Sequence, residues 1–155
     1  MVNIALQMLL GVLVANLYEW AIHRYLLHGL GTSKRSIWHF HWEHHNIART
    51  NEGYDETFLN KGYWKERLSL LLLALLNSPI AFYYPWMAGA MGVYLLSYYF
   101  IHTKAHLDPQ WARKWVPWHW DHHMGKNQNK NWCIVMPLCD HIFRTREKNF
   151  RSEYF

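Results

Sequence analysis

The chain has 155 residues, a length at which we expect one domain. Its hydrophobic content of 51% lies near the upper end for soluble proteins, and its net charge of +5 comes from Lys and Arg that are spread along the chain rather than gathered in a block. Because no nucleic-acid-binding motif accompanies them, we expect no nucleic-acid partner. Two cysteines, Cys133 and Cys139, are too few for a disulfide framework or a zinc ribbon, so we expect reduced thiols.

The first predicted element is an apolar run over residues 2–22. It is apolar on all faces and reaches about the 20 residues with which a helix crosses a bilayer. Gly11 and Ala15 are small residues four positions apart, a spacing that permits close contact with a second helix. The run has no basic start and ends in Glu19-Trp20 rather than in small residues, which is not typical of a cleavable signal peptide. We therefore predict a first transmembrane helix.

The second apolar stretch covers residues 68–101. One straight helix of that length would measure roughly 50 Å, which exceeds the ~30 Å of hydrocarbon in a bilayer. Two prolines interrupt the stretch, and Asn77-Ser-Pro79 is a turn signal. We therefore predict a hairpin of two shorter transmembrane helices, at about 68–83 and 86–101.

The basic residues avoid both apolar stretches. None of the sixteen Lys and Arg lies in residues 1–23 or 68–103. If one span is followed by a hairpin, segments 23–67 and 102–155 lie on the same side, together with every basic residue. This is the positive-inside pattern, so we predict that these segments and the C-terminus are cytoplasmic. The pattern also argues against a buried helical hairpin in a soluble core, which either apolar stretch alone would allow.

The predicted fold is therefore an all-α integral membrane protein, with a single membrane-embedded domain over residues 1–155. About three transmembrane helices carry a cytosolic helical cap that is rich in histidine. Turn-forming residues predict loops in the cap at 29–33, 51–56 and 124–130, whereas segments 41–45 and 119–123 are expected on helices.

Four histidine boxes follow the apolar stretches, two after each. They read HxxxxH, HxxHH, HxxxH and HxxHH, and they hold ten of the twelve histidines: His23, His28, His41, His44, His45, His102, His106, His119, His122 and His123. On a helix, residues three and four apart share a face, so each of the last three boxes presents its histidines on one side. The five-residue step of the first box turns through about 140° on an α-helix, so that pair needs a helix end between its members or two different metals.

Imidazole is the commonest protein ligand for metals, and it suits iron, zinc, copper and nickel. Ten ligands exceed the about four to six positions of one ion, so we predict two metal ions with positions left for water or oxygen. No carboxylate recurs at the ligand spacing of Glu-x-x-His bundles. A ligating histidine usually donates its other N–H to a carboxylate or carbonyl, so we assign supporting roles to Glu43 and Asp121, and also to Glu19 and Asn131. Solvent-facing charges are the alternative for the first two, and an ion pair with Arg24 is the alternative for Glu19.

This pattern resembles the fatty acid hydroxylase and sterol desaturase superfamily, and within it the fatty acid 2-hydroxylases most. The likeness rests on the order of the four boxes and on the segments Glu19–His28 and Phe40–His45. After the last box, Asn131-Trp-Cys133 is similar to the superfamily's Asn-aromatic-Gly turn. Asp140-His-Ile-Phe-Arg-Thr145 is similar to its Asp-x-x-Phe-Gly-Thr segment. Cys and Arg stand here in place of the two glycines.

The resemblance implies a non-haem di-iron membrane monooxygenase that uses O2 to hydroxylate an unactivated C–H of a lipid, with a fatty acyl chain as first choice. It implies that the ten box histidines bind two iron ions, which zinc can replace in a purified sample, and that no other residue is catalytic. Since no electron-transfer domain is fused, it implies a separate electron donor of ferredoxin or cytochrome b5 type with a reductase. One helix replaces a transmembrane hairpin of the eukaryotic hydroxylases, which suggests either that protomers associate into a homo-oligomer or that the fold is a minimal version.

Other functions fit the boxes less well. A carotenoid ring hydroxylase usually has four residues inside its third box, whereas His102 and His106 have three between them. A sterol-type desaturase or oxidase shares the first hydrogen abstraction with hydroxylation and stays open. A metal transporter needs ionisable ligands at mid-membrane depth, but every box lies beyond the apolar runs. A membrane metal-binding or storage protein is the non-enzyme alternative.

Overall fold

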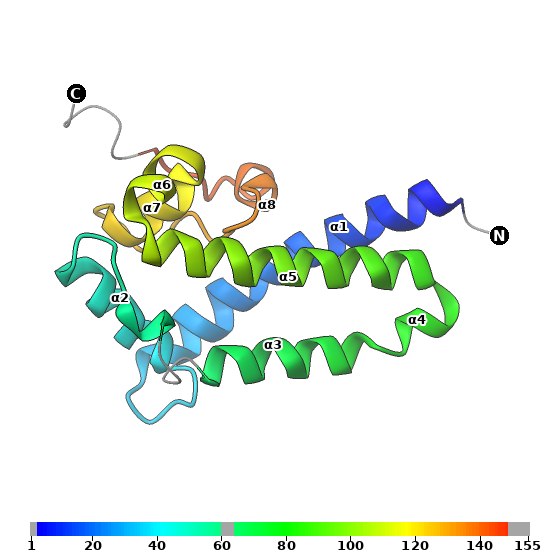
Figure 1. Ribbon diagram of the computed structural model, residues 1–155, viewed down its shortest axis with the longest axis horizontal. Helices are drawn as coiled ribbons and strands as arrows, with labels where there is room; N and C mark the ends of the chain where they lie inside the picture. Colours follow the sequence, from blue (N-terminus) through cyan, green and yellow to red (C-terminus); the bar gives the residue numbers. More distant parts are fainter. Residues whose placement is uncertain (1–2, 60–63, 149–155) are drawn as a thin grey trace.

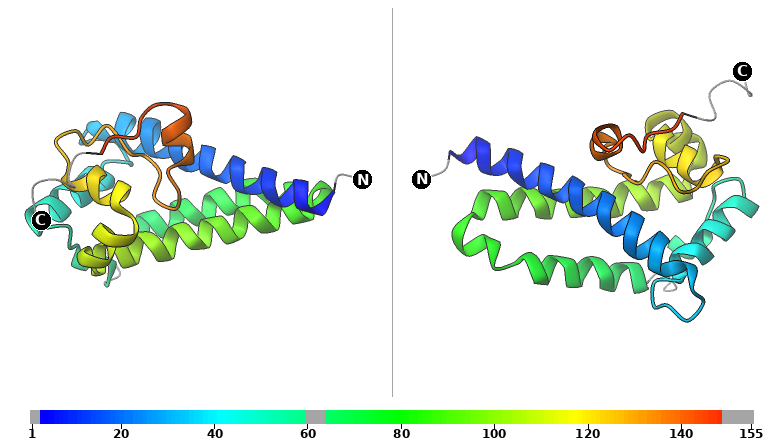
Figure 2. Two further views of the ribbon diagram at one scale, coloured as in Figure 1. Left: turned by 90° about the horizontal axis from the view of Figure 1, so that it is seen from above. Right: turned by 180° about the vertical axis from the view of Figure 1, so that it is seen from behind.

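The computed structural model describes residues 3–59 and 64–148, and over these ranges the chain is all helical and contains no strand (Figure 1). The parts of the predicted first span and cap that fall on residues 1–2, 60–63 and 149–155 lie outside the described residues. Three long helices run side by side. A short helix at residues 80–83 lies at one end of them, and the other short helices gather around the opposite end (Figures 1 and 2). This end holds all four histidine boxes.

The long helices are α1 (Ile4–Ala21), α3 (Trp64–Asn77) and α5 (Pro85–Leu107). A short helix, α4 (Ile80–Tyr83), joins α3 to α5, and the two long helices form the hairpin that the sequence predicts. The predicted helix at 68–83 differs from the structure: it begins earlier, at Trp64, and is divided into α3 and α4 by Ser78 and Pro79. α3 ends at Asn77 because the residue before a proline is disfavoured in the α conformation.

The third long helix begins at a proline and extends further than predicted. Pro85 occupies the first turn of α5, where its missing N–H leaves no hydrogen bond unmade. The helix continues past the predicted end at residue 101 to Leu107, and it therefore carries both histidines of the third box on its last turns.

A close contact fixes α1 against α5. A Cβ atom at Gly11 would lie 2.5 Å from the carbonyl oxygen of Met87 and 2.9 Å from the Cβ of Ala90. Only glycine allows the two backbones to approach so closely. Gly11 and Ala15 are both buried, so the predicted helix-contact spacing is confirmed.

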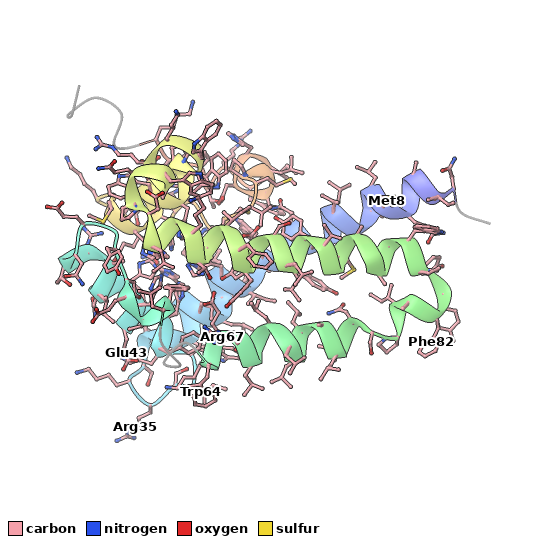
Figure 3. The ribbon with its side chains drawn as sticks, in the orientation of Figure 1. Met8, Arg35, Glu43, Trp64, Arg67 and Phe82 are labelled. Carbon is pink, nitrogen blue, oxygen red and sulfur yellow. The ribbon has the colours of Figure 1, made fainter. Side chains whose placement is uncertain are left out.

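Apolar side chains cover the outside of the long helices. Leu9 is 55% exposed, Leu76 78% and Phe82 87%, and Met8 and Phe82 lie far from the histidine end (Figure 3). Exposed apolar surface over three neighbouring helices is unusual for a soluble monomer. One helical stretch of the described chain, Ile4–Thr32, is long and apolar enough to cross a membrane, and 22% of its most apolar window is buried.

Short helices build the cap: α2 (Phe40–Thr50), α6 (Pro109–Trp115), α7 (Pro117–Met124) and α8 (Leu138–Ile142). Single 3-10 turns lie at Leu30–Thr32 and Glu56–Phe58. α6 and α7 both begin at a proline, and the Asp108 carboxylate caps α6 by accepting a hydrogen bond of 3.0 Å from the Trp111 N–H. Both HxxHH boxes lie on helices, α2 and α7, as predicted.

Candidate metal centre

The first histidine box lies on a π-helix, Ile22–Gly29, that continues α1 without a break. At its end the N–H of Leu30 donates to the carbonyl of Tyr25, a five-residue step that is characteristic of π-helices. The wider turn brings His23 and His28 to the same side, with ring centroids 5.1 Å apart. The prediction that this pair needs a helix end or two metals is wrong, because it assumed α-helical geometry.

All ten box histidines are buried, each at most 2% exposed, and they form two adjacent groups. Group A comprises five residues whose ligand atoms all lie within 4.8 Å of one another: His23, His28, His41, His45 and His122. Group B comprises four residues that meet the same limit, together with His119, whose Nε2 atom lies 3.0 Å from that of His106: His44, His102, His106, His119 and His123. The rings of His45 and His123 stack with centroids 4.1 Å apart, so the groups adjoin.

Each HxxHH box contributes to both groups, in opposite ways. On α2, the first and last histidines belong to group A and the middle one, His44, to group B. On α7, the first and last belong to group B and the middle one, His122, to group A. The two halves of the duplicated pattern are therefore interleaved in one site that could hold two ions.

Backbone carbonyls orient two histidines of group A. The Nδ1–H of His23 donates to the carbonyl oxygen of Trp132 (2.5 Å), and that of His122 donates to the carbonyl oxygen of Lys130 (2.6 Å). A carbonyl oxygen can only accept, so Nδ1 carries the proton and Nε2 keeps its lone pair. Both Nε2 atoms are thus prepared as metal ligands.

Carboxylates orient two histidines of group B. His44 donates from Nδ1 to Asp55 (2.7 Å), and His102 donates from Nδ1 to Glu66 (2.7 Å). Both carboxylates are buried. This is the usual carboxylate–histidine–metal arrangement, in which the carboxylate fixes the ring and makes the other nitrogen a stronger donor.

The nitrogen spacing in group A fits a cation. The Nε2 atom of His45 lies 3.0–3.1 Å from those of His28, His41 and His122, and the Nε2 atoms of His23 and His41 are 2.9 Å apart. A single proton can bridge only one such pair, whereas a cation binds all of them. Ligands at right angles around an ion at about 2.1 Å would be about 3.0 Å apart, which matches these distances.

Group B fits a cation by a second criterion, the buried nitrogens that lack a hydrogen bond. His106 donates from Nδ1 to the Gly53 carbonyl (2.9 Å), so its Nε2 lone pair faces His119. Within the described residues, Nε2 of His102 and Nε2 of His123 have no hydrogen-bond partner. Buried polar atoms are rarely left unpaired, and metal ligation explains these.

Burial favours the neutral form of several of these imidazoles. It is the main cause that holds the pKa of His45, His122 and His123 well below the usual range, and repulsion from neighbouring imidazoles adds to it. Only a neutral imidazole has a lone pair for a metal, so the electrostatics of the cap favour the ligand form.

The predicted supporting residues have different outcomes. Glu43 is exposed on α2, so the prediction that it supports a ligand is wrong: its neighbour His44 is supported by Asp55 instead. Asp121 is buried and forms an ion pair of 3.1 Å with Arg146. Asn131 is buried and adopts a left-handed backbone with φ of 59°.

Glu19 holds a loop rather than a histidine or Arg24. Its carboxylate is buried and accepts hydrogen bonds from the backbone N–H groups of Ile134 and Val135. Arg24 instead places its guanidinium over the Trp20 ring, 5.0 Å from the centroid. The ion pair weighed for these two residues is therefore not formed.

The sequence reasoning missed three polar residues at the site. Asp55 and Glu66 support group B, and the side-chain amide of Gln128 lies 2.9 Å from His45 Nδ1. Asp55 falls in a predicted loop, and Glu66 precedes the second apolar stretch. A search for carboxylates at the edges of the cap, rather than inside the boxes, would have found both.

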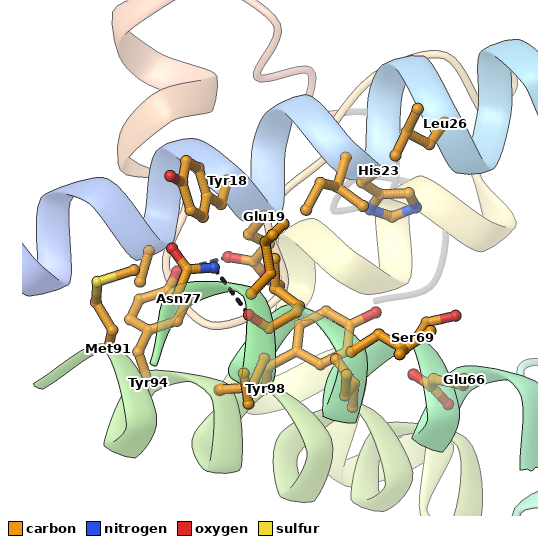
Figure 4. A pocket seen from close by; sticks show the side chains of 18 of the residues that line it. Tyr18, Glu19, His23, Leu26, Glu66, Ser69, Asn77, Met91, Tyr94 and Tyr98 are labelled. Carbon is orange, nitrogen blue, oxygen red and sulfur yellow. Dashed lines mark hydrogen bonds between the residues drawn. The ribbon is translucent and has the colours of Figure 1, made fainter. Parts of the chain in front are cut away.

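A cavity of about 350 Å³ adjoins the site between α1, α3 and α5. Its walls are mostly apolar, and His41 and Ser78 are among the lining residues. His23 and Glu66 lie toward the cap end of the cavity, whereas Asn77 lies further along it (Figure 4). Both lining histidines belong to group A, so the cavity leads to that group.

Over the described residues the chain is helical, and its two buried histidine groups, which could each hold a metal ion beside an apolar cavity, are features typical of histidine-box metalloproteins. The family model for fatty acid hydroxylases matches residues 8–145 of the chain. This chain belongs to the fatty acid hydroxylase family, a membrane-bound family of oxidoreductases, which confirms the resemblance. No curated protein and no solved structure gave a match.

Positions 133 and 144, where the resemblance leads us to expect glycine, differ in backbone conformation. Arg144 has a left-handed φ of 56°, so the glycine-like backbone is kept although an arginine stands there. Cys133 has no positive φ and is fully buried. A side chain is therefore accommodated at 133 without backbone strain.

Proposed function

We propose that this protein hydroxylates an unactivated C–H bond of a membrane lipid, an acyl chain above all, with O2 and two iron ions. The observation that carries the proposal is the apolar cavity that ends at His23 and His41 of group A. Family membership supports the reaction class and the choice of iron. A store for metal ions would have no use for a cavity of this kind.

In this proposal group A holds one ion and group B the other. Bound iron would supply the reductive activation of O2 and the removal of hydrogen from the substrate carbon. The chain's own part is to fix the ligand nitrogens, to keep them unprotonated by burial and to exclude bulk water from the reacting carbon. Electrons would come from a separate donor, of ferredoxin or cytochrome b5 type with its reductase.

The size of the cavity suits one acyl chain. A cavity of 150 Å³ holds the six carbons of benzene, so about 350 Å³ holds about 14 carbons. The cavity extends along α3 from Glu66 to Asn77, a distance of about 16 Å at 1.5 Å per residue. An extended chain advances about 1.3 Å per carbon, so about 13 carbons fit in that length. The two values agree.

The proposed setting is a bilayer crossed by α1 and by the α3–α5 hairpin. The exposed leucines on these helices support it, as does the restriction of all basic residues to the cap end and the segments beyond it. The cap would then face the cytoplasm, where it could meet the proposed electron donor. A lipid would enter the cavity sideways from the bilayer.

Lipid analysis tests this function. Lipids are extracted from cells that carry the gene, the His44→Ala variant or no gene, and hydroxylated products are measured by mass spectrometry. We expect a lipid heavier by one oxygen only with the unaltered gene. A product lighter by two hydrogens would indicate desaturation. An altered sterol or carotenoid would show that the substrate is not an acyl chain. No change in any lipid would contradict an enzymatic role.

An assay on the purified protein distinguishes an enzyme from a metal-storage protein. Iron that is reduced by dithionite should consume O2 faster when acyl lipid is present than when it is absent. Equal O2 consumption with and without lipid would favour storage.

A further inference from the structure

We propose that Glu19 and Asp140 are positioning residues for group A, which they control through loop 130–136. The inference rests on the proposed two-metal site and deepens it. Neither carboxylate forms a hydrogen bond with a histidine of the described chain; each instead fixes the backbone whose carbonyls orient two ligands. The two carboxylates thus fix the loop, and the loop orients histidines of group A but none of group B.

Glu19 connects α1 to this loop. One carboxylate oxygen accepts hydrogen bonds from the N–H of Ile134 (2.6 Å) and the N–H of Val135 (3.2 Å). The other accepts from the hydroxyl of Tyr94 on α5 (2.5 Å). The same carboxylate therefore ties the loop to α1, whose π-helical continuation carries His23 and His28, and to α5, which itself carries the third box.

Asp140 holds the preceding part of the loop from the other side. Its carboxylate accepts hydrogen bonds from the N–H groups of Trp132 (2.9 Å) and Cys133 (2.8 Å) and from the hydroxyl of Thr145 (2.7 Å). Asp140 is fully buried, with 0% exposure. A buried carboxylate is costly unless its oxygens are paired, and here the loop supplies the pairing.

The held loop is the one that orients group A. The N–H of Trp132 is fixed by Asp140, and the carbonyl of the same residue accepts from His23. Two residues earlier, the Lys130 carbonyl accepts from His122. Asn131, between them, has a left-handed backbone that turns the chain so that both carbonyls meet the histidines.

No histidine of group B forms a described hydrogen bond with this loop. Near group B, the indole N–H of Trp118, beside His119 on α7, donates to the Ile134 carbonyl (2.8 Å), but this bond does not orient a ligand ring. Asp55 and Glu66 support its histidines directly, from the segments before and within α3. Changes at Glu19 and Asp140 are therefore expected to weaken one metal site selectively. A role in folding alone would weaken both sites together.

The test uses Co²⁺ binding to the full chain, purified in detergent and freed of metal by a chelator. Bound cobalt per chain is measured by elemental analysis, and site geometry is followed by the visible absorption of Co²⁺. The variants are Glu19→Gln and Asp140→Asn, with Asp55→Asn as the matched variant for group B. Each is made alone, with His122→Ala to remove group A, and with His102→Ala to remove group B.

We expect Glu19→Gln and Asp140→Asn each to weaken one of two cobalt ions about tenfold, the low end for residues behind a ligand, and to leave the other unchanged. With His102→Ala the remaining ion should weaken about tenfold, and with His122→Ala it should not change. Asp55→Asn should give the opposite pattern. If either variant does not fold, the other carries the same test, because both hold the same loop.

Two outcomes overturn the inference: equal weakening of both ions, or a weaker remaining ion in the His122→Ala background. No change of affinity in either variant would overturn it as well. Failure of the proposed function is a different result, since the unaltered chain would then bind fewer than two cobalt ions, or would bind two and form no lipid product.

Discussion

Groups A and B have five histidines each, yet they differ in the groups that accept hydrogen bonds from these histidines. Carboxylates of Asp55 and Glu66 support group B, whereas backbone carbonyls of residues 130 and 132 support group A. A carboxylate makes an imidazole a stronger donor than a carbonyl does, so we expect group B to bind its metal more tightly. Group A alone supplies histidines to the wall of the cavity. The duplicated boxes thus form two unequal halves, one suited to hold a metal and one to meet substrate.

Removal of one ligand should abolish metal binding in the group to which that ligand belongs. His122→Ala removes a group A ligand and His44→Ala a group B ligand, and each should cost one bound metal and lower product at least about 100-fold, since both irons take part. Product is measured by mass spectrometry and metal by elemental analysis. His39→Ala is the control, because His39 bonds the Gly31 carbonyl outside both groups. Product that persists in either ligand variant would refute the assignment.

Loss of a supporting carboxylate should affect group B alone. Asp55→Asn removes the charge that faces His44, and we expect the group B metal to bind about 10–100-fold more weakly, as read by competition with a chelator. Glu43→Gln is the matched control, since Glu43 is an exposed carboxylate beside His44. If both variants weaken binding equally, the support attributed to Asp55 is not specific.

A smaller change should alter the substrate rather than the metals. Gly92 lines the cavity, and an added Cβ there meets nothing within 4 Å. Gly92→Leu should therefore fit without strain and shorten the cavity, at a cost of about 0.8 kcal/mol for each excluded methylene. The ratio of products from short and long acyl chains should rise about tenfold. Gly89→Leu, equally open but outside the cavity lining, should leave the ratio unchanged. A similar shift in both variants would contradict the proposed cavity.

The smallest expected effect concerns the contact between α1 and α5, which supports both groups. Gly11→Ala places a methyl group against the Met87 carbonyl, and overpacking of this kind costs about 1–3 kcal/mol. We expect a lower thermal midpoint and an equal, slight weakening of both metals. Selective loss of one metal would show that α1 acts on the groups separately.

The boxes, their helices and the hairpin could be predicted because their signals are local in the sequence. Apolar runs, turn residues and histidines spaced three and four apart each have a direct structural meaning. The π-helix could not be predicted, since the same HxxxxH letters fit an α-helix whose histidines diverge. Glu43 and Asp121 occupy the same place in the two HxxHH boxes, but the shared place does not give them the same surroundings: Asp121 is buried and Glu43 is exposed.

The supporting residues and the division into groups depend on tertiary contacts. Asp55 lies 11 residues from His44, and Glu66 lies 36 residues from His102, separations that no motif fixes. The split of each HxxHH box between two ions depends on how α2 and α7 face each other. Sequence therefore predicts the number of ligands, and the fold decides which ligands act together.

Iron content tests the central claim most directly. The purified chain and its His122→Ala and His44→Ala variants are reconstituted with Fe²⁺ without oxygen, freed of excess metal and submitted to elemental analysis. We predict two iron ions per chain in the unaltered protein and one in each variant. One iron or fewer in the unaltered chain would contradict the assignment of two metal-binding groups.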